Sequence, residues 1–339
     1  MIEPLDQKIT DILDELPLGL ANGKMGLSIY FFCMGRLRQE TEYTATGEKI
    51  LDSLWKDIKN IHSIDVKDGL SGIGLGIDYL IKNNYVEGDI NKILEDVDNE
   101  IFKQLSYPKY SNTLDSLSLI HILYYLCQRY PSLKNGSESQ YLYQELIIQT
   151  VNNLYKDMDS SFYEEPFSYN IDYPLPQYLF VLSKIYSLGF YNDRLIKIIE
   201  ELIYKVSSIL PRLHSNRLYL LWGMVALNKI INDKQLREQI SLLKKHTDFE
   251  YIFNNKTNYK NIFFKDSIMS IYLLIRNLQD QFDPKEIESV NESIKNNIYF
   301  SETWNLLDKN KHFFEKHIGL YDGYAGISLL LQNLELTKQ

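Results

Sequence analysis

Two carboxylates, Asp65 and Asp68, stand just ahead of a glycine-rich start to the apolar segment 69–80. Acidic residues at such a place can act as functional carboxylates at the mouth of a site, or they can favour the positive end of the helix that follows. Both interpretations are open from the sequence. His214, directly before Ser215 and Asn216, poses the same choice between a site residue and part of a polar helix cap.

A second acidic pair, Glu164 and Glu165, precedes Pro166 and raises the remote alternative of a glycosidase. Glycosidases use two carboxylates that flank a sugar, and adjacency in sequence does not establish such a pair. The sequence contains no nucleophile elbow, phosphate-binding loop, dinucleotide glycine motif before a strand, or zinc-protease motif. His121 falls in an apolar run, which predicts a packed, hydrogen-bonded core histidine.

The motif Gly-x-x-Gly followed by an apolar helix occurs three times, at Gly23 and Gly26, Gly69 and Gly72, and Gly323 and Gly326. Glycine costs about 1 kcal/mol relative to alanine inside a helix. Its recurrence at helix starts therefore predicts close backbone packing or a special turn conformation. Because the two glycines of a motif share one helical face, a neighbouring backbone can approach that face closely.

Predicted helices alternate between a type that is apolar nearly all round and an amphipathic type. The apolar helices are predicted at residues 26–37, 69–80, 117–126, 174–186, 218–227 and 267–278 and after residue 323. The amphipathic helices are predicted at residues 48–61, 91–105, 141–158, 194–209 and 284–297. Helix starts recur about every 50 residues, a period typical of helical hairpin repeats.

A helix that is apolar all round is buried, and an amphipathic helix covers it, so the hairpins should form two concentric layers. An open solenoid has polar caps at its ends, whereas here the first and last repeats carry the strongest motif, which favours a closed ring. The prediction is an all-α fold, a double ring of about seven helical hairpins. Without a linker, residues 1–339 should form a single domain.

Composition excludes several classes of protein. The net charge is −9, with no basic stripe, so nucleic acid is not an expected partner. No signal peptide and no apolar run of about 18 residues appear, so we expect a cytoplasmic protein without a transmembrane segment.

Cys33 and Cys127 lie in apolar helical contexts and are predicted to be buried free thiols. The 26 tyrosines either reflect AT-rich codons or line an aromatic ligand groove.

Seven hairpins with glycine at the inner helix starts resemble the lanthionine synthetase C (LanC) family, whose fold is an α/α toroid. The segment 65–72, Asp-Val-Lys-Asp-Gly-Leu-Ser-Gly, is similar to the family's Asp-x-x-x-Gly-Leu-Ser-Gly motif, and 323–326 matches its last glycine motif. Family members add Cys thiols to dehydrated Ser or Thr in ribosomally made peptides. The resemblance implies a zinc ion, held by two Cys and one His, and acid/base work by a His and the motif Asp.

Compared with the family's motifs position by position, this sequence retains the aspartate, as Asp65, but has other residues at the remaining site positions. Tyr173 stands in place of the usual His, His214 in place of a zinc Cys, and Lys265 and Asp266 in place of the Cys-His pair. The candidate catalytic residues are therefore Asp65, His214 and Tyr173. Catalytic zinc needs three protein ligands, and only His214 and Asp266 could contribute, so they are weak metal candidates and we expect no cofactor.

The resemblance implies a role in the maturation of a lanthipeptide-type peptide. The missing ligands favour a zinc-less relative that binds a peptide or a partner and catalyses nothing itself. The alternative is an active lanthionine synthetase. Expected partners are a peptide substrate or its leader peptide, and also a dehydratase or an exporter.

Overall fold

The computed structural model describes residues 4–107, 114–254, 261–265 and 268–336. Within these ranges the regular elements are helices, and no strand occurs among them, which confirms the all-α prediction. The chain divides into two compact units. Unit 1 comprises Met1–Gln104, Asn261–Met269 and Ile294–Gln339, and unit 2 comprises Leu105–Lys260 and Ser270–Ser293.

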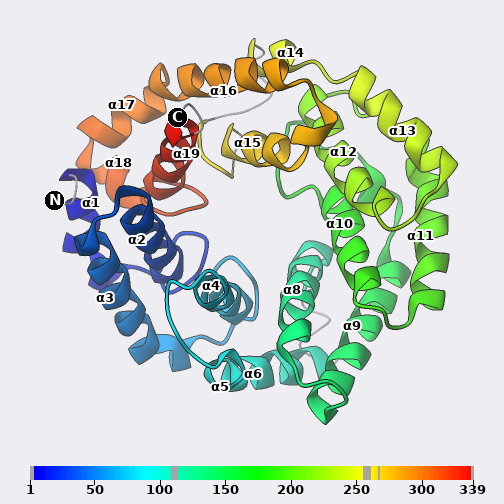
Figure 1. Ribbon diagram of the computed structural model, residues 1–339, viewed down its shortest axis with the longest axis horizontal. Coiled ribbons are helices and arrows are strands. Elements are labelled where there is room, and N and C mark those ends of the chain that lie inside the picture. Colours follow the sequence, from blue (N-terminus) through cyan, green and yellow to red (C-terminus); the bar gives the residue numbers. More distant parts are fainter. Residues whose placement is uncertain (1–3, 108–113, 255–260, 266–267, 337–339) are drawn as a thin grey trace. The chain divides into compact units, whose positions relative to one another are not determined.

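Unit 1 is built from the two ends of the chain (Figure 1). Its N-terminal helices are α1 (Pro4–Asp11), α2 (Lys24–Arg38), α3 (Thr41–Asp57), α4 (Leu70–Lys82), α5 (Ile90–Ile93) and most of α6 (Glu95–Ser106). Its C-terminal helices are α17 (Glu302–Lys309), α18 (Lys311–Lys316) and α19 (Tyr324–Leu336).

The buried helix of unit 1 is α2, which packs against α3, α4 and α19. Gly47 of α3 lets this contact close, because a Cβ there would lie 3.1 Å from the ring of Phe32. Ser28 donates to the Gly47 carbonyl at 3.0 Å in the same buried interface. The contact between α2 and α19 brings the first and last repeats together, as the prediction of a closed arrangement requires.

Unit 2 places three consecutive inner helices side by side: α8 (Ser116–Arg129), α10 (Pro174–Ser187) and α12 (His214–Asn228). Each contacts the helix that follows it, namely α9 (Glu138–Asp157), α11 (Asn192–Val206) and α13 (Lys234–Lys245), while α14 (Phe249–Asn254) lies against α12. Gly223 permits a close crossing of α10 and α12, since a Cβ there would lie 2.5 Å from the Pro176 carbonyl oxygen.

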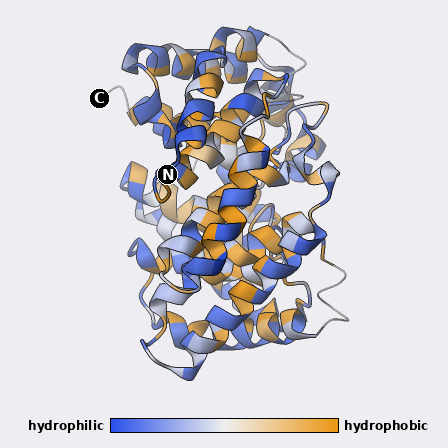
Figure 2. Cartoon of the chain, turned by 90° about the vertical axis from the view of Figure 1, so that its right-hand side faces the viewer, coloured by the Kyte–Doolittle hydropathy of each residue, from blue (hydrophilic) through white to orange (hydrophobic). Residues whose placement is uncertain are grey.

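The helices that follow the inner ones are amphipathic, as predicted. On α11 the buried residues fall at one-face spacing: Leu195, Ile198, Ile199, Leu202, Ile203 and Val206. Figure 2 shows hydrophobic and hydrophilic residues alternating along the helix ribbons that face the viewer. Two further helices, α15 (Ile268–Asn277) and α16 (Pro284–Tyr299), contain residues of both units.

Boundaries differ from the predictions in a few places. The fifth inner helix, which runs through 218–227, begins at His214, where its predicted repeat starts, and Glu165 from a distant loop caps that start. The segment 91–105 forms two helices, α5 and α6, and the short helices α17 and α18 were not predicted. The predicted start of the third inner helix at 112–113 and that of the sixth at 266–267 lie outside the described residues.

Candidate functional site

Three loops carry the repeated motif and precede α2, α4 and α19; we call residues 19–23, 65–69 and 319–323 the glycine loops. Backbone hydrogen bonds join them inside unit 1. The N–H of Ala21 donates to the carbonyl of Lys67 at 2.8 Å, and the N–H of Tyr321 donates to the carbonyl of Ala21 at 2.9 Å. Lys265 extends the series by donating its N–H to the carbonyl of Tyr321 at 3.0 Å. The three motifs therefore form one continuous backbone junction.

Close packing is the reason for the glycines. A Cβ on Gly69 would lie 2.5 Å from the carbonyl oxygen of Ser63, and one on Gly72 would overlap that of Val66. The backbone of Gly69 has φ −108°, which any residue can adopt. The other motifs repeat this contact with the carbonyl six residues earlier, at Gly23, Gly26, Gly323 and Gly326. Of the two explanations that the sequence offered, close approach is confirmed.

Backbone carbonyls two residues ahead of the glycine loops cap the helices that follow. The N–H of Leu70 donates to the carbonyl of Ser63 at 2.9 Å, and Lys24 and Tyr324 make the equivalent bonds at 2.7 and 2.8 Å. These bonds satisfy first-turn N–H groups that have no partner inside the helix. Neither α2 nor α4 has a side-chain cap.

Asp65 braces its own loop. One carboxylate oxygen accepts the N–H of Asp68 at 2.7 Å, and the other accepts the hydroxyl of Ser63. The side chain is half-buried and does not cap α4 directly. Asp68 is exposed; partial burial and the nearby charge of Asp65 raise the pKa of its carboxyl. The local bonds of Asp65 support the structural interpretation of this pair.

Lys265 is paired within unit 1. Its ammonium nitrogen lies 3.8 Å from a carboxylate oxygen of Asp322, whose other oxygen is 3.7 Å from Nδ1 of His317. Asp322 therefore makes ion-pair contacts, and the half-buried His317 stacks on Phe263 with ring centroids 5.1 Å apart. Asp266 lies outside the described residues.

His214, at the start of α12 in unit 2, accepts a hydrogen bond at one ring nitrogen and has a guanidinium beside the other. The N–H of Asp248 donates to Nδ1 at 2.9 Å, so in the neutral ring the proton resides on Nε2. Nε2 lies 3.2 Å from a guanidinium nitrogen of Arg217, and the ring packs against Tyr251 at 4.5 Å. Burial, followed by the charge of Arg217, lowers the pKa of His214. The structure thus holds His214 as a neutral imidazole.

Arg217 is the main organiser of this end of unit 2. Its guanidinium donates to the carbonyls of Pro211 at 2.6 Å, Arg212 at 3.2 Å and His246 at 2.6 Å. These bonds connect the segment before α12 with the segment that follows α13. A fixed cation therefore already lies beside the only nitrogen of His214 that could face a metal.

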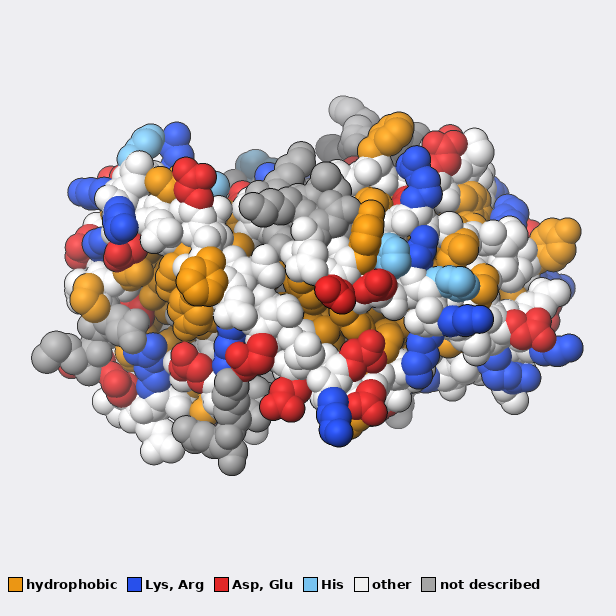
Figure 3. All heavy atoms as spheres, turned by 90° about the horizontal axis from the view of Figure 1, so that it is seen from above, with side chains coloured by type: hydrophobic (Ala, Val, Ile, Leu, Met, Phe, Trp, Pro, Cys, Tyr) orange, Lys and Arg blue, Asp and Glu red, His pale blue; other side chains and the backbone are white. Residues whose placement is uncertain are grey.

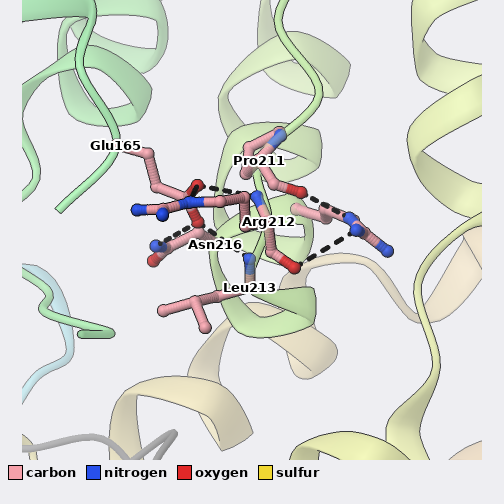
Figure 4. Close-up of polar contacts among 6 residues, drawn as sticks. Glu165, Pro211, Arg212, Leu213 and Asn216 are labelled. Atoms are coloured by element: carbon pink, nitrogen blue, oxygen red, sulfur yellow. Dashed lines mark hydrogen bonds and ion pairs between the residues drawn. The ribbon is translucent and has the colours of Figure 1, made fainter. Parts of the chain in front are cut away.

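Glu165 caps α12 from a segment about one repeat earlier in the chain (Figure 4). One oxygen accepts the N–H of Arg212 at 2.6 Å, and the other accepts the N–H of Leu213 at 2.8 Å and the amide of Asn216 at 2.9 Å. The carboxylate side chain is only 11% exposed. The predicted cap from His214, Ser215 and Asn216 is therefore wrong, because Glu165 supplies the acceptor. This use also removes the observation that suggested a glycosidase.

Tyr173 occupies the N-cap position of α10 but gives no side-chain cap. It is 2% exposed, and its hydroxyl has no hydrogen-bond partner within the described residues. Burial, followed by the nearby negative charge of Glu165, raises its pKa. Its ring packs edge-on against Tyr219 with centroids 6.4 Å apart. Tyr173 is therefore held as a neutral phenol, a poor general base.

The donors among the described residues do not fit a catalytic zinc ion. A site needs three ligands with free lone pairs. His214 already accepts one N–H and faces a guanidinium, while Lys265 is a cation paired with Asp322. Across residues 4–107, 114–254, 261–265 and 268–336, no group of three His, Cys, Asp or Glu side chains could hold a metal ion.

The remaining predicted residues show mixed outcomes. Cys127 is buried, and burial raises the pKa of its thiol to about 12, whereas Cys33 is only half-buried between the hydroxyls of Tyr79 and Tyr85. His121 is hydrogen-bonded to Gln177 at 2.6 Å but half-buried rather than in the core.

On the face in Figure 3, acidic and basic side chains are interspersed. No described helix is long and apolar enough to cross a membrane.

Sequence reasoning missed the roles of Glu165 and Arg217. Glu165 was noted only as one of an adjacent acidic pair, although its partners lie 47 to 51 residues further along the chain. Arg217 gave no signal beyond its place in the first turn of an inner helix. No local signal in the sequence links Glu165 to the start of α12, 48 residues later.

Neither a family model nor a curated protein matches the sequence. Among solved structures, nisin cyclase matches with a TM-score of 0.68 at 14% sequence identity. The match covers 98% of this chain and 93% of the nisin cyclase chain. The chain therefore has the α/α-toroid fold of nisin cyclase, as its resemblance to the LanC family predicts.

Proposed function

We propose that this protein binds a ribosomally made, lanthipeptide-type peptide during its maturation and does not use zinc to activate a thiol. Support for the peptide comes from the shared fold, which covers 98% of this chain and 93% of a protein named for cyclising nisin. A dehydratase or an exporter that handles the same peptide is the proposed protein partner, and the cytoplasm is the proposed location. Residues 1–339 are proposed to act as a single LanC-like domain.

The observation that carries the absence of zinc chemistry is the environment of His214. Zinc supplies LanC-type chemistry by stabilising a thiolate near neutral pH, whereas a free thiol with its usual pKa of about 8.5 is mostly protonated. The backbone N–H of Asp248 already donates to one nitrogen of His214, and the charged guanidinium of Arg217 lies beside the other. The candidate acid/base groups are also poorly placed for catalysis, because Tyr173 is a buried phenol and the Asp65 carboxylate accepts a hydrogen bond within its own loop.

Purified protein titrated with a precursor peptide rich in Cys, Ser and Thr, before and after its dehydration, provides the test. We expect calorimetry to detect binding, and mass spectrometry after thiol alkylation to show that the dehydrated peptide cyclises no faster than in buffer. Absence of binding would remove the proposed function. Faster cyclisation would instead favour an active synthetase, and Asp65→Asn would then decide the role of Asp65: a lost rate identifies an acid/base group, and an unchanged rate leaves a loop brace.

A further inference from the structure

Three aromatic side chains form a row across the inner helices of unit 2. Tyr124 of α8, Phe180 of α10 and Trp222 of α12 have successive ring centroids 6.1 and 4.4 Å apart. The rings of Phe180 and Trp222 are stacked at 21°. We call these three residues the aromatic row. All three are half-buried, so each leaves part of its ring accessible.

The aromatic row lies on a face that the helices of unit 2 leave partly open. Half-buried residues recur on α8 at Leu117, His121, Tyr124 and Gln128, the spacing of one helical face. The hydrogen bond between His121 and Gln177 lies one turn before the row on α8 and α10. Fully buried positions between them, such as Leu123 and Leu182, face the interior. The row therefore belongs to a surface with a polar border rather than to the core.

The charges of these three helices favour an acidic ligand on this surface. The sequences of α8, α10 and α12 contain no Asp or Glu, although the whole chain has a net charge of −9. Of their three charged residues, Arg129 is buried and Arg217 donates to loop carbonyls, so Lys184 is the one that contributes charge to this surface. Lys184 is exposed, and its ammonium lies 5.2 Å from the centroid of the Phe180 ring. A ligand that carries carboxylates complements such a surface.

We infer that the aromatic row binds an extended, acidic segment of a peptide through alternate apolar or aromatic side chains. The successive ring centroids limit the row to about 10 Å, the length of about three residues of extended chain. In such a chain alternate side chains point to one face and can pack on the rings. This inference rests on the proposed function for the identity of the ligand as a peptide.

A neutral sugar is the other common ligand of aromatic platforms, and the same observations disfavour it. Sugar hydroxyls need acceptors as well as a stacking surface, and carboxylates are acceptors. The helices that bear the row supply no carboxylate. A peptide can satisfy its backbone groups in solvent at the open side while its side chains pack on the rings.

Trp222 offers a direct reporter of occupancy. In a Trp55→Phe, Trp304→Phe variant it is the sole tryptophan of the three in the chain. The probes are capped hexapeptides of alternating phenylalanine and glutamate, alanine and glutamate, or phenylalanine and lysine. We expect the first to change Trp222 fluorescence and to bind about tenfold more tightly than either of the others. Equal affinity for the three probes, or an equal fluorescence response to a glucose hexasaccharide, would overturn the inference.

Phe180→Ala should weaken binding of the phenylalanine–glutamate probe about tenfold, and Lys184→Gln should weaken it severalfold. The matched control is Phe167→Ala, because Phe167 is 95% exposed and lies outside the row; its affinity should be unchanged. If Phe180→Ala proves unstable by circular dichroism, Phe180→Leu preserves packing and should still weaken binding severalfold. Unchanged affinity in a folded Phe180 variant, or an equal loss in the control, contradicts the inference.

The precursor peptide separates this inference from the proposed function. If wild type and Phe180→Ala bind the precursor equally, the aromatic row is not its site although peptide binding stands. If the precursor does not bind but the phenylalanine–glutamate probe does, the row recognises peptide and the proposed maturation role is wrong.

Discussion

The two units start their inner helices in different ways. In unit 1, backbone carbonyls two residues ahead of the glycine loops cap α2, α4 and α19, as in the 2.9 Å bond from the N–H of Leu70 to the carbonyl of Ser63. In unit 2, side chains cap α8 and α12: Asp115 accepts the N–H of Ser118 at 2.7 Å, and Glu165 accepts the N–H of Leu213. A backbone cap requires glycine because no Cβ fits, whereas a side-chain cap requires a specific acceptor.

Substituting a glycine of unit 1 should have the largest effect. Gly72→Ala puts a Cβ into the Val66 carbonyl, which is backbone and cannot swing away. We expect a loss of about 3 kcal/mol in the free energy of unfolding, measured by denaturant titration. The control is Gly88→Ala, whose Cβ would meet only the end of the Ile93 side chain at 2.5 Å. Similar stability of the two variants would show that the backbone around Gly72 is not tightly packed.

Removing the side-chain cap of unit 2 should cost less. Glu165→Ala leaves the N–H groups of Arg212 and Leu213 and the amide of Asn216 without their acceptor. We expect a loss of about 2 kcal/mol in unfolding free energy, because partly buried donors lose charge-assisted bonds. Thermal denaturation of the exposed neighbour variant Glu164→Ala serves as the control and should match wild type. If both variants melt like wild type, α12 does not depend on this cap.

A pH effect should appear at His214 in unit 2. Its pKa is lowered by burial and by Arg217, so the unfolded chain binds this proton more readily than the folded chain. The resulting stability is present above the unfolded pKa of about 6.5 and is lost as pH falls toward the lower folded value. The decline in unfolding free energy below pH 6.5 should be smaller in His214→Gln than in wild type. Identical pH profiles would mean that His214 titrates normally.

Metal should have the smallest effect on either unit. Because His214 faces Arg217 in unit 2 and Lys265 pairs with Asp322 in unit 1, we expect well under one zinc per purified chain. Chelators should leave helicity and melting temperature unchanged. Elemental analysis that finds stoichiometric zinc, lost in His214→Ala, would show that these side chains rearrange around a metal and would favour an active enzyme.

Local sequence signals were sufficient to predict the main helices and the close backbone contacts at the glycine loops. Periodic apolar residues predicted α10 from residue 174 and α9 to within three residues of each end, because a buried face must repeat with the period of the helix. Gly-x-x-Gly predicted the close backbone approach at Gly69 and Gly72, because only a missing Cβ explains two glycines on one helical face. The all-α fold follows from signals that lie within one helix or one turn.

The tertiary structure alone decided which residues serve the site. Glu165 became a helix cap because folding brings it to Leu213, 48 residues away, and no local pattern encodes that distance. His214 accepts the N–H of Asp248, 34 residues away, and lies beside the guanidinium of Arg217 only because the fold brings these groups together. Tyr124, Phe180 and Trp222 became one surface only when three helices packed side by side. Hydrogen bonds and ring contacts act over a few ångströms, so residues distant in sequence acquire their roles only when the fold makes them neighbours.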